Sequence, residues 1–136
     1  MSESVFEFPV RVYYEDTDAG QVVYHSNYLN FMERARTEWL RDLGYEQDHL
    51  RDELGILFVV RAINIQYLKP AKFNQQLCVT SMVTEKGKSQ FICHQDVFLV
   101  EQEQRDLLTT ADVSIVCVSA DRFKPTRIPM SIIDKL

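Results

Sequence analysis

The chain has 136 residues and 46% hydrophobic composition, enough for one domain with a hydrophobic core, which we expect to cover residues 1–136. Its net charge of −5 argues against a nucleic-acid partner, since such proteins carry basic stripes for phosphate contacts. No apolar run approaches the roughly 18 to 20 residues that cross a bilayer, and the N-terminus lacks a secretion signal, so we expect a cytoplasmic protein without a transmembrane segment.

The first predicted element is a β-strand over residues 6–14, where apolar and polar side chains alternate. Pro9 has no backbone N–H to donate, so its presence indicates an edge strand or a bulge. The strand would bury every second side chain, namely Phe6, Phe8, Val10, Val12 and Tyr14.

A long amphipathic helix is predicted next. Ser26 or Asn27 can cap its start, and Gly44 can end it. The charged segment 45–55 could hold a short second helix. The long helix would bury the residues that recur every three or four positions, namely Tyr28, Phe31, Met32, Ala35, Trp39 and Leu43.

Residues 56–119 contain four β-branched, apolar runs, which predict four further strands. The breaks fall at residues 69–75, 85–89 and 101–106, and Gly87 in the second break can take a positive φ. All three connections are short enough for antiparallel pairing. The predicted class is therefore α+β, with a five-stranded antiparallel sheet and one long helix.

One helix cannot cover both faces of such a sheet. We therefore expect the sheet to curl around the helix and to bury its other face against a second copy, as a homo-oligomer. Three widely spaced cysteines lie inside apolar segments, which predicts buried free thiols rather than disulfides or a zinc site: Cys78, Cys93 and Cys117.

Residues 13–25, called the acidic loop below, hold three carboxylates and a histidine just before the long helix. The simplest interpretation is structural: Asp16 and Asp18 accept hydrogen bonds from nearby backbone amides, as aspartate commonly does in turns. A metal site would use these two aspartates and His25 as ligands. Neither His49 nor His94 has a partner at a recognisable ligand spacing, so we expect no metal and no cofactor.

Hydrolysis of an activated acyl group is a further interpretation of the acidic loop. A carboxylate just ahead of a helix can act as a general base or as a nucleophile. The free amides and positive dipole end of the helix can polarise a carbonyl group. Both halves of such a site are present in this stretch of sequence.

The motif Y-x-D-T-D-A-G-x-V-V-Y-H-x-N-Y at residues 14–28, followed by E-R-A-R-T-E, carries a family resemblance. It resembles the hotdog-fold acyl-CoA thioesterases of the 4-hydroxybenzoyl-CoA thioesterase family, in the Tol-Pal-associated (YbgC-type) branch. The resemblance extends nearly end to end, through F-V-V-R, Y-x-x-P-A at residues 67–71 and K-P-x-x-x-P at residues 124–129.

This resemblance implies one central helix wrapped by an antiparallel sheet, in dimers that join their sheets and assemble as a homotetramer, a dimer of dimers. It implies that Asp18 is the catalytic carboxylate and His25 a second active-site residue. Many members have glycine where this chain has Gln21. If that position needs a positive φ, glutamine costs about 1 kcal/mol or more.

In the mechanism we expect, the thioester carbonyl accepts hydrogen bonds from amides near Tyr24, Ser26 and Asn27. Asp18 then activates water or attacks the carbonyl itself to form a mixed anhydride, and the sequence leaves both routes open. His25 positions water or substrate.

The rest of the acyl-CoA needs charge and apolar surface from elsewhere in the chain. For the acyl group we expect an apolar slot that includes Val59 and Val60, although the same residues are also ordinary core material. For the CoA phosphates we expect local positive charge, above all from Arg61, Lys86 and Lys88, although lysines also simply solubilise turns.

A different class of function stays open. The same fold could bind acyl-CoA or an acylated acyl carrier protein without hydrolysis, as a scaffold. The resemblance keeps this alternative open because the Tol-Pal-associated branch is linked to envelope and phospholipid functions.

Overall fold

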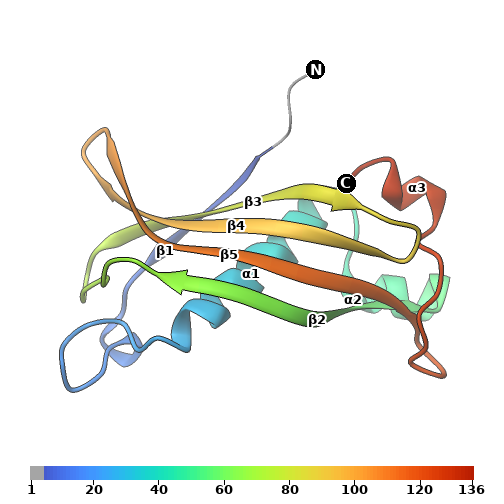
Figure 1. Cartoon of the computed structure of the whole chain (residues 1–136), viewed down its shortest axis with the longest axis horizontal. Helices are drawn as coiled ribbons and strands as arrows, with labels where there is room; N and C mark the ends of the chain where they lie inside the picture. The colour runs from blue at the N-terminus through green and yellow to red at the C-terminus, as the bar shows by residue number, and fades with distance from the viewer. Residues whose placement is uncertain (1–4) are drawn as a thin grey trace.

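The computed structural model describes residues 5–136 as one antiparallel sheet with a long helix against its inner face. The order of strands across the sheet is β1-β3-β4-β5-β2, so β1 and β2 form its two edges (Figure 1). The α+β architecture expected from the sequence is confirmed. The strands are β1 (Phe6–Arg11), β2 (Ile56–Tyr67), β3 (Gln76–Lys86), β4 (Gln90–Glu101) and β5 (Gln104–Ser119).

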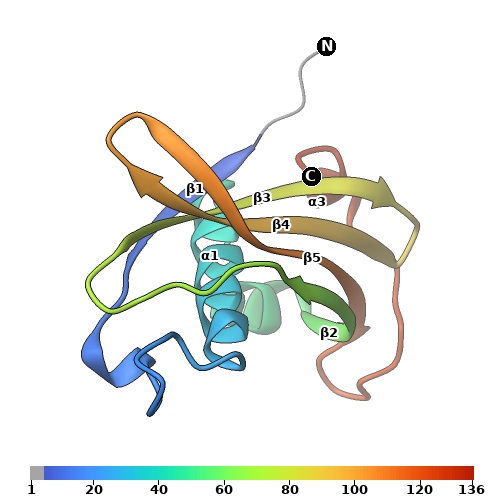
Figure 2. The ribbon, with the colours of Figure 1, turned by 60° about the vertical axis from the view of Figure 1, so that its left-hand side comes forward.

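The long helix is α1 (Asn27–Asp42), and the sheet arches over it (Figure 2). The predicted side chains face the sheet: Tyr28, Phe31, Met32, Ala35 and Trp39 are buried, and Leu43 is half-buried. The remaining helical elements are shorter. They are the 3-10 turn η1 (Tyr14–Asp16), α2 (Gln47–His49), the π-helical turn η2 (Leu50–Leu54) and α3 (Met130–Ile133).

The two ends of α1 differ from each other in how they are capped. Gly44 takes φ +100°, and its N–H donates to Arg41 O while the N–H of Tyr45 donates to Leu40 O, which is a Schellman motif. This confirms Gly44 as the stop. The predicted side-chain cap at the start is wrong, because Ser26 occupies the N-cap position without capping and Asn27 bonds elsewhere.

Three other local predictions are wrong. The alternating pattern continues to Tyr14, but β1 ends at Arg11. Tyr14 lies in η1 and is 79% exposed instead of buried. Gly87 does not take a positive φ, since Lys86 before it is still paired to β4. The third break is shorter than expected, because Gln102 adopts φ +55° and lets the chain turn over two residues.

The sheet register explains where the edges lie and how the strands bend. Pro9 sits in β1 at the sheet edge, as predicted. β2 pairs with β5 over its whole length and has a bulge between Val60 and Ala62. Its other side is the second free edge of the sheet. A bulge at an edge re-aims the side chains beside it, which here include that of Arg61.

The core consists of two clusters along α1. One surrounds Phe31 and Met32 and receives Val10 and Val12 from the first strand and its exit. The other surrounds Trp39 and Phe91, whose rings meet edge to face at 6.0 Å. The three cysteines are free and buried as predicted, and burial raises the pKa of the Cys93 and Cys117 thiols to about 11.

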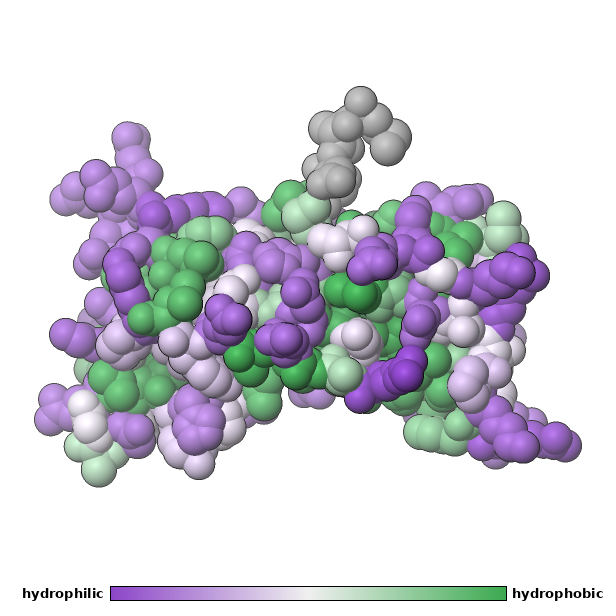
Figure 3. Space-filling view, in the orientation of Figure 1, coloured by the Kyte–Doolittle hydropathy of each residue, from purple (hydrophilic) through white to green (hydrophobic). Residues whose placement is uncertain are grey.

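The outer face of the sheet alternates apolar and charged patches (Figure 3). At its centre Nδ1 of His94 lies 2.8 Å from Asp112, and Nε2 lies 3.1 Å from Asp96, which also accepts from Thr110. Burial alone lowers the pKa of His94, but the two carboxylates outweigh it and the net pKa is raised. Among residues 5–136, no helix is both long and apolar enough to cross a bilayer.

Replacing Gly44 with alanine tests the helix stop. The Cβ would meet no heavy atom within 4 Å, so the cost comes from the positive φ alone, and the free energy of unfolding should fall by about 1–2 kcal/mol. Urea denaturation measures this change. Ser26→Ala is the control at the other end and should change stability by less than about 0.5 kcal/mol, since no cap is lost. Equal effects of the two changes would contradict this description of the caps.

Candidate active site

The acidic loop folds back on itself as a narrow hairpin. Thr17 and Val23 form an isolated bridge, and the N–H of Asp18 donates to Val22 O at 2.9 Å. The N–H of Gln21 closes the turn by donating to the carbonyl of Asp18 at 2.9 Å. Gln21 takes φ +64°, the left-handed conformation in which a non-glycine residue costs about 1 kcal/mol or more.

Asp16 fastens this hairpin to the start of α1. Asp16 is only 8% exposed, and both oxygens of its carboxylate accept hydrogen bonds: Oδ2 from the N–H of Tyr13 at 2.8 Å and Oδ1 from Nδ2 of Asn27 at 2.7 Å. Its own carbonyl accepts from the N–H of Tyr24 at 3.0 Å. One residue therefore joins the beginning of the loop, its end and the first residue of the helix.

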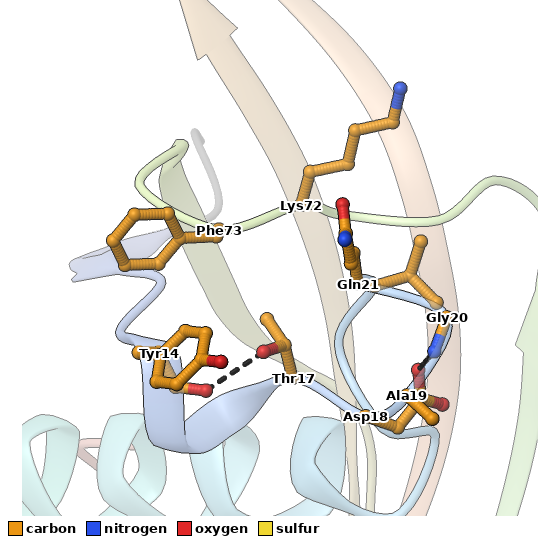
Figure 4. A pocket seen from close by; sticks show the side chains of 9 residues that line it. Tyr14, Thr17, Asp18, Ala19, Gly20, Gln21, Lys72 and Phe73 are labelled. Atoms are coloured by element: carbon orange, nitrogen blue, oxygen red, sulfur yellow. Dashed lines mark hydrogen bonds between the residues drawn. The ribbon is translucent and has the colours of Figure 1, made fainter.

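Asp18 is exposed at the tip of the hairpin, and Oδ1 accepts from the N–H of Gly20 at 2.8 Å. Both aspartates thus do bond to backbone amides, as the structural interpretation predicts. Oδ2 of Asp18 accepts no hydrogen bond from residues 5–136. Asp18 lines a cavity of about 920 Å³, whose other wall is formed by Lys72 and Phe73 (Figure 4).

Sequence reasoning missed the residues across this cavity. An isolated bridge between Val22 and Lys72 sets the 69–75 connection beside the hairpin, and Phe73 meets the ring of Tyr14 edge to face at 5.9 Å. Tyr14 belongs to the motif, but the alternating pattern of residues 6–14 predicts a strand at this position. Lys72 directly follows the Y-x-x-P-A motif, which is the signal that could have identified it.

His25 lies in a different cavity from Asp18. Its exposed ring contacts those of Tyr24 and Tyr67, at centroid distances of 4.6 and 6.0 Å. With Tyr28 and Tyr67 it lines a cavity of about 240 Å³. A single chain therefore does not place its two predicted catalytic side chains in one shared pocket.

The backbone amides before α1 are only partly available to a ligand. Those of Tyr24 and Asn27 already donate to Asp16 O and Tyr24 O, at 3.0 and 2.8 Å. Those of His25 and Ser26 have no acceptor among residues 5–136. Any carbonyl-binding role at this helix start therefore falls to His25 and Ser26.

The other predicted substrate contacts lie away from Asp18. Val59 and Val60 line a cavity of about 310 Å³ between β2 and α1. Arg61 and Lys86 line another, of about 420 Å³, at the turn between β3 and β4, where Lys88 is also exposed. Nζ of Lys86 donates to the carbonyls of residues 133 and 136, so its charge is partly engaged by the C-terminal segment.

The alternative of a metal site, which would use Asp16, Asp18 and His25, finds no support in their placement. Among the described residues, no group of three or more His, Cys, Asp or Glu side chains is arranged to hold a metal ion. The carboxylate of Asp16 is turned inward to Tyr13 and Asn27, away from the cavity that Asp18 lines.

A family profile described as "Thioesterase superfamily" matches residues 20–105, more than half of the chain. The chain belongs to the thioesterase superfamily. The "Acyl-CoA thioesterase YbgC" of Haemophilus influenzae is 41% identical over 97% of this chain and 94% of its own length. The "Acyl-CoA thioester hydrolase YbgC" of Escherichia coli O157:H7 is also 41% identical, over 98% and 96%. These relatives confirm the predicted branch and enzyme class.

Solved structures confirm the hotdog fold of this superfamily member. A probable thioesterase from Bartonella henselae superposes with a TM-score of 0.85 at 33% identity, covering 93% of this chain and 100% of its own. A 4-hydroxybenzoyl-CoA thioesterase superposes with a TM-score of 0.91 over 96% of this chain and 97% of its own. The latter is only 18% identical, so it supports the fold alone.

Asp16→Ala tests the anchor of the acidic loop. Removing a buried carboxylate that accepts two hydrogen bonds should lower the free energy of unfolding by about 2 kcal/mol or more. Chemical denaturation gives the value. Glu15→Ala is the matched control, because that neighbouring side chain is exposed, and it should change stability by less than about 0.5 kcal/mol. A stability loss as small as that of the control would show that Asp16 does not hold the loop.

Proposed function

We propose that this thioesterase hydrolyses acyl-CoA to the free acid and CoA, with Asp18 as general base or nucleophile. The observation that carries the proposal is the geometry of Asp18. It has one carboxylate oxygen without a partner among the described residues, on a hairpin fastened to the start of α1 and facing a large cavity. The names of the 41% identical relatives support acyl-CoA as substrate.

In this mechanism the thioester carbonyl accepts hydrogen bonds from the N–H groups of His25 and Ser26. The positive end of the α1 dipole stabilises the negative charge that develops on the carbonyl oxygen. In the general-base route Asp18 takes a proton from water, the water oxygen bonds to the carbonyl carbon, and the C–S bond breaks. In the nucleophilic route Asp18 forms a mixed anhydride, which water then hydrolyses.

The leaving group makes little demand on an acid catalyst. CoA departs as a thiolate, whose conjugate acid has a pKa of about 8.5 by analogy with cysteine. His25 is therefore proposed to position water or the acyl group rather than to donate an obligatory proton. Its ring nitrogens accept and donate no hydrogen bond within residues 5–136 and are free for that task.

A complete site is proposed to need two copies of the chain. The acidic loop lies at one end of the molecule, whereas the β3–β4 turn with Lys86 and Lys88 lies at the other (Figure 1). The edge strand β2 runs between these ends, with Ile56 on the side of the β3–β4 turn and Tyr67 on the side of His25. An antiparallel pairing of two β2 edges would set the first half of one β2 beside His25 of the other copy.

This pairing would gather the dispersed predictions in one place. Val59 and Val60 of one copy would border the catalytic loop of the other, as an acyl slot. Arg61 and Lys88 would lie on the same side to meet the CoA phosphates, with Lys86 contributing where the C-terminal segment leaves it free. A dimer of dimers, a cytoplasmic location and a task linked to the Tol-Pal system follow from the family resemblance and stay proposals.

Asp18→Asn should abolish thiol release from acyl-CoA while leaving the unfolding transition unchanged, because the exposed carboxylate is needed for chemistry and not for folding. Thiol release measured across acyl chain lengths tests this, with Glu15→Gln as the control carboxylate. An unchanged turnover number for Asp18→Asn would exclude the assignment. Release by neither wild type nor variant would favour a non-hydrolytic acyl-CoA or acyl-carrier-protein binder.

Mixing two inactive variants tests the shared site. Asp18→Asn removes the catalyst, and Val60→Asp places a charge in the acyl slot. Co-expression should restore about one quarter of wild-type activity, because random mixing makes half the dimers mixed and each mixed dimer has one intact site. Light scattering on Val60→Asp alone controls for assembly. A mixture no more active than its components, with both variants still dimeric, would show that the two residues serve the same copy.

A further inference from the structure

Arg36 differs from the solvated helix arginine that its sequence position suggests. Its guanidinium is half-buried, and Nη1 donates to Oε1 of Gln95 at 2.9 Å. Gln95 is fully buried under α1, and its Nε2 donates to Met32 O at 3.1 Å and to Oγ of Ser81 at 2.9 Å. The three hydrogen bonds of Gln95 therefore fix where the guanidinium of Arg36 points.

The guanidinium forms no ion pair in direct contact within the described part of the chain, and Glu33 on the same helix acts on it only at longer range. Arginine has five N–H donors, and Arg36 uses one of them on an acceptor within residues 5–136. No carboxylate there lies within 4.0 Å of it, whereas Arg41 and Arg105 both form such ion pairs. Burial lowers the pKa of Arg36, as expected of a partly desolvated cation. Unused donors in such a place favour an acceptor from a ligand.

Arg36 lines the same cavity of about 310 Å³ as Val59 and Val60. The rest of the wall is mostly apolar, including Phe58, Phe91 and Ile115. An apolar cavity with few convergent polar groups is the usual form of a small-molecule site. The polar side chains on its wall are those of Glu33, Thr37, Gln47 and Arg36, and the guanidinium of Arg36 is the one that carries positive charge.

We infer that this cavity receives an acyl group that carries a neutral oxygen acceptor, as a hydroxyl or keto group, and that Arg36 selects for it. The inference rests on the proposed acyl-CoA hydrolysis and names its substrate class. Apolar walls from β2 hold the hydrocarbon part, and the fork of Arg36 donates to the oxygen. Glu33 borders the same cavity and repels a carboxylate, so a neutral oxygen fits better than an anionic one.

The test compares substrates of equal length. Thiol release would be measured with hexanoyl-CoA, 3-hydroxyhexanoyl-CoA, 6-hydroxyhexanoyl-CoA and adipoyl-CoA, using wild type and Arg36→Met. Wild type should favour at least one oxygen-bearing substrate over hexanoyl-CoA by about tenfold in kcat/KM, the effect of one hydrogen bond to a charged group. Arg36→Met should remove that preference, so that kcat/KM for the favoured oxygen-bearing substrate falls about tenfold relative to kcat/KM for hexanoyl-CoA.

Two further variants guard the result. Arg34→Met is the matched control, since Arg34 is exposed on the same helix, and it should keep the preference. Arg36→Lys keeps the positive charge but lacks the several N–H donors of the guanidinium, so it should retain part of the preference for oxygen-bearing substrates. This variant also tests the inference if Arg36→Met does not fold.

The inference fails if wild type treats all four substrates alike, or if Arg36→Met lowers all four equally. It also fails if Arg36→Met keeps the preference for oxygen-bearing substrates while light scattering shows that its oligomer has dissociated. The partner of the Arg36 guanidinium would then be a carboxylate of a second copy rather than the substrate. If wild type releases no thiol at all, the proposed hydrolysis fails instead. Calorimetry then measures the binding of the same four thioesters to wild type and Arg36→Met. Arg36 selects the oxygen-bearing thioesters if wild type binds at least one of them more tightly than hexanoyl-CoA and Arg36→Met does not.

Discussion

The buried carboxylate of Asp16 is the interaction on which the rest of the site depends. It holds the backbone of Tyr13 at the beginning of the acidic loop and the side chain of Asn27 at the helix start, while the main-chain carbonyl of Asp16 holds Tyr24. The hairpin carries a strained Gln21 and an exposed Asp18, so these bonds oppose the tendency of such a loop to move. A carboxylate catalyst needs this kind of support, because small displacements of a reacting group cost large factors in rate.

A second constraint comes from the length of the sheet. The groups that an acyl-CoA needs are distributed between its two ends and the β2 edge, so one chain offers them in separate cavities. We propose that pairing of two β2 edges brings them together. The same edge would otherwise expose unpaired backbone groups, which natural sheets usually cover or pair. Assembly and catalysis would then depend on one strand.

The sequence predicts the elements whose patterns are long. The buried face of α1 and the four later strands follow from many repeated positions, so single exceptions do not change them. The end of β1 has no such repetition to mark it, because Tyr14 continues the alternating pattern after the backbone has turned into η1. At the site, the family motif identifies Asp18. The inward orientation of Asp16 depends on its hydrogen bond with Asn27, and the partly buried position of Arg36 depends on its hydrogen bond with Gln95. Gln95 lies 59 residues from Arg36, and no local pattern reveals such a contact.

Amide hydrogen exchange along β2 measures directly whether a second copy of the chain pairs with this edge. Alternate N–H groups between Ile56 and Tyr67 point away from β5. If two β2 edges pair, these outward amides should be protected as strongly as the inward ones, and dilution to the monomer should expose them. Exchange of the outward amides at the rate of an unstructured peptide, in a sample that hydrolyses acyl-CoA, would contradict this pairing.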